Sequence, residues 1–558
     1  MNTFMLKIFP MGGIGRVTKN MFVYELGDDM VVVDCGIGFA PMEMPGVDIL
    51  VPDTQYLQDR LAAGAILHGI VLTHGHDDHI AALPYVLREI GVDVPIYGSP
   101  LTAEFAMTRL ADQDIEKEVQ YFDEGQLKLG PFTFETIRVT HSVPDTRHLV
   151  IRTPEGVIYH GSDFKIDLTP VDGQHMDLQK IANIGREGVL CALLDCLRIE
   201  RRDPTASESV LRGTLRREMH DVKGKVIVTL MSSNLHRVQQ VIDVASEFDR
   251  KISFIGRSVE QNVNTAMNMG LLNFPPNIKL NKRNLEGVPD DQICLVVAGS
   301  QGQAGSSLVR AVSGEHRLVN IHRGDKVIVA SEPIPGNEIN VYGVIDELAE
   351  KGIDVAYSDV DDDLHVSGHA GEYEQMLMVH LLKPKYLFPI GGEERHRVRF
   401  SHVVEHHGYN LNQIVLPHYG KPVELDANGF RYGKEIKLRE RTITVAGTTS
   451  QVMDQVLADR EILGKQGVIV VAMNEVAGNY DLNNMSVEER GLGLTSPEEQ
   501  EQLYQIVRET VRETLAKNGQ DAKDLPMQIK NDIRYRIRQE SEKEPLVLVI
   551  INSIEGNV

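Results

Sequence analysis

The chain has 558 residues and a formal net charge of −23, from 57 Lys and Arg against 80 Asp and Glu. This charge excludes a generally cationic nucleic-acid coat, although an acidic protein can still carry a local basic groove. Its 4 cysteines are too few for a disulfide scaffold, and they lack the CxxC pairing of a structural zinc site. The chain starts without a signal-peptide pattern, and no apolar run reaches the roughly 20 residues of a membrane span. We therefore expect a soluble cytoplasmic protein.

Short strands interspersed with helices are predicted over the first 190 residues. Strands are expected at 22–24, 30–34 and 65–72, where β-branched and aromatic residues stand between turn residues. Apolar side chains at 83, 86, 87 and 90 share one face of a predicted helix. Short strands with helices outside them indicate an α/β or α+β sandwich.

From about residue 205 the chain changes to strand–loop–helix units. Thr205 to Glu208 has the form of a capping box before a helix that includes Leu211 and Met219. A second helix is predicted over 338–350. Near-continuous apolar strands that alternate with helices indicate a parallel sheet covered on both faces. These strands are expected at 226–230, 252–255, 294–297, 327–329 and 353–356.

The pattern of apolar residues in the last part of the chain predicts a small α/β module. A strand is expected at 467–472, an amphipathic helix at 497–517 and a final strand at 546–551, in the order strand–helix–helix–strand. It has no recognisable chemistry, so a role in assembly or docking is the expectation.

The segment His74-Gly75-His76-Asp77-Asp78-His79 carries the clearest chemical signal. It follows an apolar strand and precedes a helix, so it is a loop at the end of a sheet strand. Gly75 allows a turn on which alternate side chains converge. Imidazole nitrogens and carboxylate oxygens in such a cluster suit two neighbouring divalent cations of the zinc or manganese type. A solvated polar loop is the alternative, and it is disfavoured because so many titratable groups are costly to pack together without a cation.

This HxHxDH pattern resembles the metallo-β-lactamase family. The family's other motifs are found in the same order in this chain: Asp34 comes before the pattern, and His141 and Asp163 come after it. The resemblance implies that His74, His76 and His141 hold one ion, that Asp78 and His79 hold a second, and that Asp163 bridges the two. Zn²⁺ is the expected metal, with Mn²⁺ or Mg²⁺ as alternatives.

The middle of the chain resembles the β-CASP group of nucleases, and ribonuclease J in particular. Asp195 resembles motif A, and His365-Val366-Ser367-Gly368-His369 resembles motif B. The segments 233–240, 299–302 and 333–338 are similar to ribonuclease J. The resemblance implies a metallo-β-lactamase αββα sandwich with an inserted parallel-sheet domain and a small C-terminal α/β domain. The expected parts are 1–203 and 361–435 for the sandwich, 204–360 for the β-CASP insert, 436–450 for a linker and 451–558 for the C-terminal domain.

Two segments are candidates for phosphate binding. Ser232, Ser233 and Asn234 stand where a strand hands over to a helix, and a helix N-terminus favours phosphate. Simple helix capping is the alternative, and we prefer it for the similar segment 299–307. The segment 365–369 is expected to face the scissile phosphate. Asp78, Asp195 and His369 are the candidate catalytic residues.

One departure from the resemblance bears on activity. Ribonuclease J has a histidine in its Pro-x-His-Gly-Glu segment that completes the second metal site, and Gly391 stands at that position here. Glycine has no side chain to donate. We therefore expect a weakened second site, or one completed by water or by His396.

The preferred interpretation is a metal-dependent ribonuclease of RNA maturation and decay. The resemblance implies a 5′-to-3′ exonuclease that also cuts internally, acts on single-stranded RNA with a 5′-monophosphate and forms a homodimer or higher oligomer. Backbone contacts from Arg237, Arg257 and Arg310 are candidates. The alternative is a weakly active or inactive RNA-binding paralogue that serves as a partner subunit, because of Gly391. A small-molecule hydrolase is disfavoured by the inserted domain.

Overall fold

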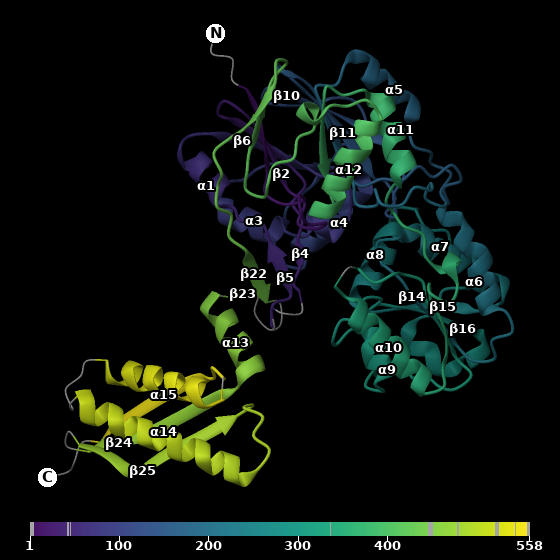
Figure 1. Cartoon of the computed structure of the whole chain (residues 1–558). Coiled ribbons are helices and arrows are strands. Elements are labelled where there is room, and N and C mark those ends of the chain that lie inside the picture. Colours follow the sequence, from purple (N-terminus) through teal and green to yellow (C-terminus); the bar gives the residue numbers. More distant parts are fainter. Residues whose placement is uncertain are drawn as a thin grey trace. The chain divides into compact units, whose positions relative to one another are not determined.

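A computed structural model describes residues 5–41, 44, 46–334, 336–444, 450–452, 454–476, 479–518, 524–541 and 543–554. The chain forms two compact units, one of residues 1–39 and 49–441 and the other of residues 40–48 and 442–558. Figure 1 shows the course of the chain through each unit.

Two mixed sheets face each other in the larger unit. Their strand orders are β21-β20-β1-β2-β3-β6-β7-β8 and β19-β13-β12-β11-β10-β9. Side chains of both sheets form one buried hydrophobic cluster, so the core lies between them. The first sheet consists of β1 (Leu6–Pro10), β2 (Phe22–Leu26), β3 (Asp29–Val33), β6 (Ile66–Val71), β7 (Ile96–Gly98), β8 (Gln120–Tyr121), β20 (Val423–Leu425) and β21 (Phe430–Tyr432). The second consists of β9 (Leu127–Leu129), β10 (Phe132–Arg138), β11 (Arg147–Thr153), β12 (Gly156–Gly161), β13 (Cys191–Asp195) and β19 (Tyr386–Ile390). Two short strands, β4 (Gly38–Phe39) and β5 (Ile49–Val51), form a separate antiparallel pair.

Helices cover the outer faces of both sheets (Figure 1). On the first sheet, Tyr56 of α1 packs edge-on against Phe9 of β1, with 4.7 Å between the ring centroids. On the second, side chains of α5, α11 and α12 share a buried cluster with Ala192 and Leu194 of β13. The layers are helix, sheet, sheet and helix, which confirms the predicted sandwich. The helices are α1 (Gln55–Ala62), α2 (Asp77–Ile80), α3 (Leu83–Ile90), α4 (Pro100–Ala111), α5 (Leu178–Glu187), α11 (Glu372–Leu382) and α12 (Glu394–His406).

Strand β13 shows why the interior strands of these sheets consist of continuous apolar runs. Cys191 and Leu193 face the cluster between the sheets, whereas Ala192 and Leu194 face the helices. A strand buried on both sides needs apolar residues at every position. The strand pairs in parallel with β12 and β19, so Asp195 at its carboxyl end lies level with Ile390. Asp195, the polar residue that ends this run, therefore lies at the carboxyl ends of the strands, beside Gly391.

The inserted part of the larger unit is built on a five-stranded parallel sheet. Its order is β15-β16-β14-β17-β18, and every adjacent pair is parallel, as the sequence predicts. Helices α9 and α10 pack against it through a shared buried cluster. The strands are β14 (Val226–Thr229), β15 (Lys251–Ile255), β16 (Ile293–Val297), β17 (Lys326–Val329) and β18 (Asp354–Ala356). The helices are α6 (Leu211–Met219), α7 (Leu235–Glu247), α8 (Arg257–Asn268), α9 (Ser307–Val312) and α10 (Glu338–Glu350).

The predicted capping box at Thr205 to Glu208 is wrong. The backbone N–H of Thr205 donates to Glu374 at 2.8 Å, not to Glu208. The Glu208 carboxylate instead accepts from the guanidinium of Arg237 at 2.7 Å, and Ser207 caps the short turn that follows. A buried cation is a stronger partner for a carboxylate than one backbone N–H, which explains the difference.

The smaller unit consists of a three-stranded sheet with two long helices packed against it. The sheet order is β25-β24-β26, and side chains of α14 and α15 complete its core. The sequence interpretation missed β25, whose polar residues give little strand signal. No described helix is both long and apolar enough to cross a lipid bilayer. The elements are β22 (Arg441–Thr444), β23 (Ser450–Gln451), α13 (Asp454–Gln466), β24 (Val468–Val476), β25 (Asn479–Arg490), α14 (Pro497–Asn518), α15 (Leu525–Ser541) and β26 (Leu546–Ile554).

Candidate metal centre

The loop between β6 and α2 carries His74 and His76, and α2 itself carries His79, so three histidines lie at the edge of the first sheet. β6 ends at Val71 and α2 begins at Asp77, as expected for a loop after a sheet strand. A Cβ on Gly75 would lie 2.7 Å from the ring of Phe105, so the loop runs too close to that ring for a larger residue. On this path His74 and His79 are buried.

Asp34 holds the loop from behind. Its carboxylate accepts hydrogen bonds from the backbone N–H of Thr73 at 2.8 Å and from the Thr73 hydroxyl at 2.8 Å. The ring Nδ1 of His79 lies 2.7 Å from the same carboxylate. Since Nδ1 donates to Asp34, Nε2 of His79 is the nitrogen that faces the other candidate ligands.

Four of the predicted metal ligands meet at one point: His74, His76, His141 and Asp163 place one donor atom each within 4.8 Å of one another. His76 Nδ1 lies 3.1 Å from His74 Nε2 and 3.1 Å from His141 Nε2. Asp163 Oδ2 lies 3.6 Å from His74 Nε2 and 3.8 Å from His141 Nε2. The ligands of a tetrahedral zinc ion with bonds of about 2.0–2.1 Å are about 3.4 Å apart. The donor set and its spacing therefore fit one zinc-like ion.

The three histidines of this group are held in the form that binds metal. Burial lowers the pKa of His76 to about 4 and the pKa values of His74 and His141 well below the ordinary range. A neutral imidazole has a lone pair to donate. His141 donates from Nδ1 to the carbonyl of Gly368 at 2.7 Å, which leaves its Nε2 for the metal position.

His369 and Asp195 lie beside this group. Nδ1 of His369 is 2.7 Å from Asp195 Oδ2, and the backbone N–H of Leu197 donates to Asp195 Oδ1 at 2.8 Å. Burial opposes the charge on His369, but the carboxylates of Asp195 and Asp163 prevail and raise its pKa to about 9. The neighbouring carboxylates therefore favour the protonated form of His369, which lines the cleft.

The rest of the segment 365–369 supports the site rather than facing the metal position. His365 accepts from the backbone N–H of Glu332 at 3.2 Å, and burial together with Arg237 lowers its pKa to about 3. Val366 and Gly368 use their carbonyl groups, the first accepting from Arg237 at 3.3 Å and the second from His141. The hydroxyl of Ser367 accepts from the backbone N–H of His369 at 3.2 Å.

Arg237 is not the RNA contact that the sequence interpretation proposed. It is 1% exposed, and its guanidinium donates to Glu208 at 2.7 Å and to the carbonyl of Ala330 at 2.5 Å. Of the other two candidate arginines, Arg257 is exposed at the start of α8 and Arg310 is half-buried in α9. No sequence motif marks Glu208 as the partner of Arg237, because the two are 29 positions apart.

The segment 232–234 begins α7 and lines the cleft. Asn234 caps the helix, since its side-chain oxygen accepts from the backbone N–H of Arg237 at 3.0 Å, and its amide donates to Glu208 at 3.2 Å. The Ser232 hydroxyl accepts from Asn262 at 3.1 Å. Ser232 and Ser233 are partly exposed, so their polar groups are the ones open to a ligand. In the similar segment 299–307, Ser306 caps α9 as expected.

The predicted second metal position brings His79, Asp78 and Asp163 together, and Asp163 also forms a group of possible ligands with Asp195 and His369. Nε2 of His79 lies 3.6 Å from Asp78 Oδ2 and 3.4 Å from Asp163 Oδ2. Gly391 has a φ of +71°, and a Cβ there would lie 3.2 Å from Asp195 Oδ1. His396 does not replace the missing ligand, because its Nδ1 accepts from the Glu393 N–H at 3.1 Å and its Nε2 lies 3.7 Å from Glu200.

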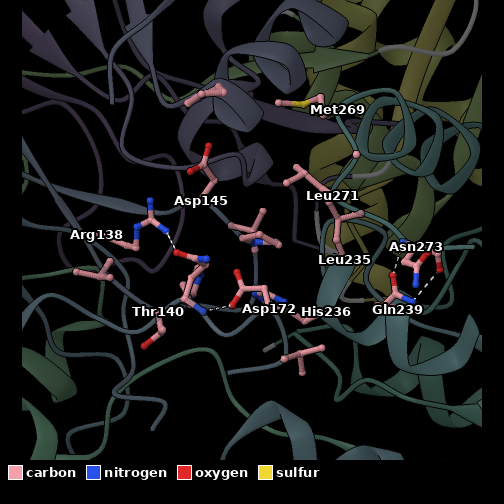
Figure 2. Close-up of a pocket in the computed structure, with 18 of the residues that line it drawn as sticks. Arg138, Thr140, Asp145, Asp172, Leu235, His236, Gln239, Met269, Leu271 and Asn273 are labelled. Carbon is pink, nitrogen blue, oxygen red and sulfur yellow. Dashed lines mark hydrogen bonds between the residues drawn. The ribbon is translucent and has the colours of Figure 1, made fainter. Parts of the chain in front are cut away.

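Two cavities adjoin these residues. One of about 290 Å³ opens between the sandwich and the parallel-sheet part and is lined among others by His76, Asp78, Asp163, Ser232, Ser233 and His369. The other, of about 790 Å³, lies along the loop that carries His141 and is shown in Figure 2. Its polar lining has both signs of charge and includes Arg138, Asp145 and Asp172.

Four family models match this chain. They are described as the metallo-beta-lactamase superfamily (residues 14–164), the beta-CASP domain of ribonuclease J (223–348), the Zn-dependent metallo-hydrolase RNA specificity domain (352–417) and the ribonuclease J C-terminal domain (455–554). Together they extend over the sandwich, the inserted sheet and the smaller unit.

Relatives match over almost the whole chain. The chain is 33% identical to Ribonuclease J of Helicobacter pylori over 541 residues, which is 96% of this chain and 77% of that protein. It is 34% identical to Ribonuclease J of Thermus thermophilus, over 99% of this chain and 95% of that one. It is 30% identical to Ribonuclease J2 of Bacillus subtilis, over 99% of each. A solved protein of unknown function from Enterococcus faecalis matches 75% of this chain and 100% of its own, with a TM-score of 0.52 and 15% identity, which shows a shared fold.

Proposed function

This chain belongs to the ribonuclease J family of metal-dependent ribonucleases, and we propose that it degrades single-stranded RNA from a 5′-monophosphate end and also cuts within the strand. The cleft supports this proposal because candidate metal ligands, a proton donor and a helix N-terminus all line it. RNA maturation and decay are the processes that such an activity serves.

His74, His76, His141 and Asp163 would hold a divalent ion, Zn²⁺ before Mn²⁺ or Mg²⁺. Asp78, His79 and Asp163 would hold a second ion, and the lack of a side chain at Gly391 would weaken that position. When bound, a divalent ion in such a site polarises the phosphate and activates water for attack on phosphorus. The protein's part is to fix this geometry, and Asp34 does so by holding Thr73 and His79 in place.

His369 protonates the leaving ribose oxygen. Its Nδ1 is engaged with Asp195, so Nε2 is the atom left for the substrate. Because its pKa is about 9, the imidazole has a proton to give at neutral pH. Asp195 is the positioning residue, since it fixes the ring and stabilises its charge. Asp78 helps to hold this reacting centre through its place beside His79.

Phosphate binding falls to the start of α7 and to the segment 365–369. Ser232 and Ser233 offer hydroxyls and backbone N–H groups at a helix N-terminus, where an anion is stabilised. Asn234 caps that terminus, and the Ser367 hydroxyl accepts a hydrogen bond from the backbone N–H of His369. Gly368 orients His141 through its carbonyl, and His365 and Val366 contact Glu332 and Arg237. The RNA backbone is thereby clamped between the two parts of the larger unit.

The convergence of His74, His76, His141 and Asp163 next to His369 is the observation that supports the proposal most strongly. The test is to incubate metal-loaded protein with 5′-monophosphorylated RNA and with the same RNA bearing a 5′-hydroxyl. We expect mononucleotides from the first substrate, internal cuts in both, and neither product with His76→Ala. Cleavage that persists in His76→Ala would place the activity elsewhere.

Gly391 favours a second function, that of a weakly active RNA-binding partner subunit. A histidine ligand is absent from the position beside Asp195 and Asp163. In this case the wild-type protein retains RNA in a filter-binding assay but releases no product with Zn²⁺, Mn²⁺ or Mg²⁺. Addition of an active ribonuclease J would then restore cleavage.

We also propose that the chain assembles as a homodimer or higher oligomer, with the C-terminal module contributing. Light scattering after size-exclusion chromatography tests this directly. A mass of one chain, about 62.2 kDa, at micromolar concentration would contradict it.

A further inference from the structure

We propose that Glu374 is a positioning residue that fixes the inserted domain at the metal centre, because its one carboxylate holds both chain segments that cross between the sandwich and the insert. The inference rests on the proposed ribonuclease function, and it concerns how the two walls of the cleft are kept together. Glu374 lies in the first turn of α11 and is 2% exposed. None of the motifs found in the sequence includes it.

The carboxylate of Glu374 accepts three backbone hydrogen bonds of 2.8 Å each. Oε1 accepts from the N–H of Ile166, and Oε2 accepts from the N–H groups of Thr205 and Gly371. The bond from Gly371 is the local cap of α11. Ile166 and Thr205, however, lie 208 and 169 positions away in the chain. Helix capping explains only one of the three bonds, so the other two join separate parts of the fold.

Two of these donors belong to the segments that enter and leave the inserted domain. Thr205 precedes α6 of the insert, and Gly371 follows β18, its last strand. The two segments also contact each other, since the N–H of Glu372 donates to the carbonyl of Arg201 at 2.7 Å. A Cβ on Gly371 would come within 2.4 Å of the backbone oxygen of Asp203. The carboxylate therefore closes the junction through which the insert is attached to the sandwich.

The third donor, Ile166, connects this junction to the candidate metal ligands. It comes shortly after Asp163 in the chain. Its neighbour Lys165 donates its backbone N–H to the carbonyl of Thr140 at 2.8 Å, and Thr140 precedes His141. The segment that carries Asp163 is thus paired with the one that carries His141. The same carboxylate holds this pair of segments and both crossings of the insert.

The junction also holds the proton donor proposed for the reaction. The hydroxyl of Thr205 donates to the backbone carbonyl of His369 at 2.7 Å, and it accepts from Arg198 at 2.8 Å. Because Glu374 fixes the backbone of Thr205, a displacement there moves His369 together with the insert. Small displacements of reacting groups are costly in rate. RNA cleavage is therefore expected to depend on this carboxylate.

Glutamine cannot replace Glu374, although it has the same size. Its amide has one oxygen, and its N–H₂ group would face a backbone N–H that now has an acceptor. A buried donor without a partner is unfavourable, so at least one of the three segments is released. The metal ligands themselves keep all their donor atoms in this variant.

The experiment compares two substrates on the metal-loaded full chain. 5′-Monophosphorylated RNA needs the insert and the proton donor. Bis(p-nitrophenyl) phosphate is too short to be held by both parts of the cleft, and its p-nitrophenolate leaves without a proton. We expect Glu374→Gln to lower kcat/KM for RNA by about 10²-fold and to leave the rate on the small diester near the wild-type value. Thr205→Val keeps the shape of the side chain but removes the hydroxyl, so it should change the ratio of the two activities in the same direction.

Glu25→Gln is the matched control. Glu25 is 5% exposed and pairs with Lys7 at 2.8 Å and Arg60 at 3.2 Å, so it joins β2 to β1 and α1. Its loss should lower stability without a change in the ratio of the two activities. Hydrogen exchange, measured by mass spectrometry, is a readout that needs no activity. Glu374→Gln should raise exchange in both 199–207 and 366–373, and Glu25→Gln should raise it in neither.

An equal loss on both substrates, or exchange that rises only at the start of α11, would overturn the inference and leave Glu374 as a helix cap. If Glu374→Gln does not fold, Thr205→Val decides, and an unchanged ratio in that variant would overturn the inference as well. A wild type that binds metal but cleaves no RNA refutes the proposed function. In that case the exchange pattern alone decides whether Glu374 holds both crossings.

Discussion

Nδ1 of His369 lies 2.7 Å from the Asp195 carboxylate, although 174 positions separate the two residues in the chain. Asp195 ends the central strand β13, and His369 follows the whole inserted domain. Their hydrogen bond fixes the ring at the edge of the cleft. The mechanism therefore depends on a carboxylate that acts through His369.

Asp195→Asn should slow RNA cleavage by about 10²-fold or more, because the amide neither stabilises a charged imidazole nor fixes its orientation. We expect kcat to fall and KM to change little. Steady-state kinetics with 5′-monophosphorylated RNA checks this. Asp177→Asn is the control, since Asn also caps the start of α5. A large rise in KM with kcat intact would mean that Asp195 serves binding instead.

The cleavage rate should fall as the pH rises through about 9, because His369 loses its proton there. The raised pKa depends first on Asp195, so in Asp195→Asn the alkaline limb should move to lower pH. The measurement is the pH dependence of kcat at saturating metal. An alkaline limb that stays in place in the variant would assign it to another group.

Glu208→Gln should destabilise the protein by about 3–5 kcal/mol at pH 7, because the buried Arg237 loses its counter-charge. Burial opposes the charge on Glu208, but Arg237 lowers its pKa below the ordinary value of 4.5. The stabilisation is therefore present above about pH 4.5 and is lost as the pH falls through the lower folded pKa.

Urea denaturation at pH 7 and at stepwise lower pH checks this prediction. The wild type should lose stability below about pH 4.5, and Glu208→Gln should show a weaker loss there. Glu461→Gln, at an exposed site on α13, should change the free energy of unfolding by less than about 0.5 kcal/mol. Equal acid sensitivity in wild type and Glu208→Gln would show that the buried pair does not govern it.

Gly36→Ala should disrupt the metal loop. A Cβ at this position would lie 1.5 Å from the backbone oxygen of Asp78, so the loop must shift. We expect a loss of about 1–3 kcal/mol in stability and a weaker affinity for the first ion. Thermal unfolding and zinc titration measure the two effects.

Gly213→Ala is the matched control for that substitution. Gly213 lies in α6 with nothing within 4 Å of an added Cβ. Alanine should therefore stabilise the protein by about 0.5–1 kcal/mol and leave metal binding unchanged. Equal behaviour of the two variants would refute the argument from steric contact.

Much of the fold could be predicted because burial leaves a local pattern. The strands β13 to β17 are apolar at nearly every position, since both faces are covered. The metal-binding character of the segment from His74 to His79 could also be predicted, because its donor residues are neighbours in sequence. In β25 the apolar residues are irregularly spaced and one face is polar, so its residues alone do not indicate a strand. Its strand conformation depends on pairing with β24.

The supporting contacts of the site could not be predicted. Glu208 with Arg237, and Asn20 with His79, are pairs whose members lie far apart in the chain and carry no motif. The capping-box form of Thr205 to Glu208 even pointed to the wrong partner. Such pairs depend on which elements the fold packs together, and tertiary contacts override local propensity there.

The insertion of the parallel sheet between β13 and β19 has a consequence for the order of synthesis. A nascent chain that has emerged as far as Asp195 has all four donors of the three-histidine site but neither His369 nor the carbonyl that orients His141. The proton donor arrives only after the inserted domain has been translated. We therefore expect that the ribosome-bound fragment does not cleave the messenger RNA that encodes it. Cleavage activity is gained only after His369 and β19 have been translated and have folded onto β13.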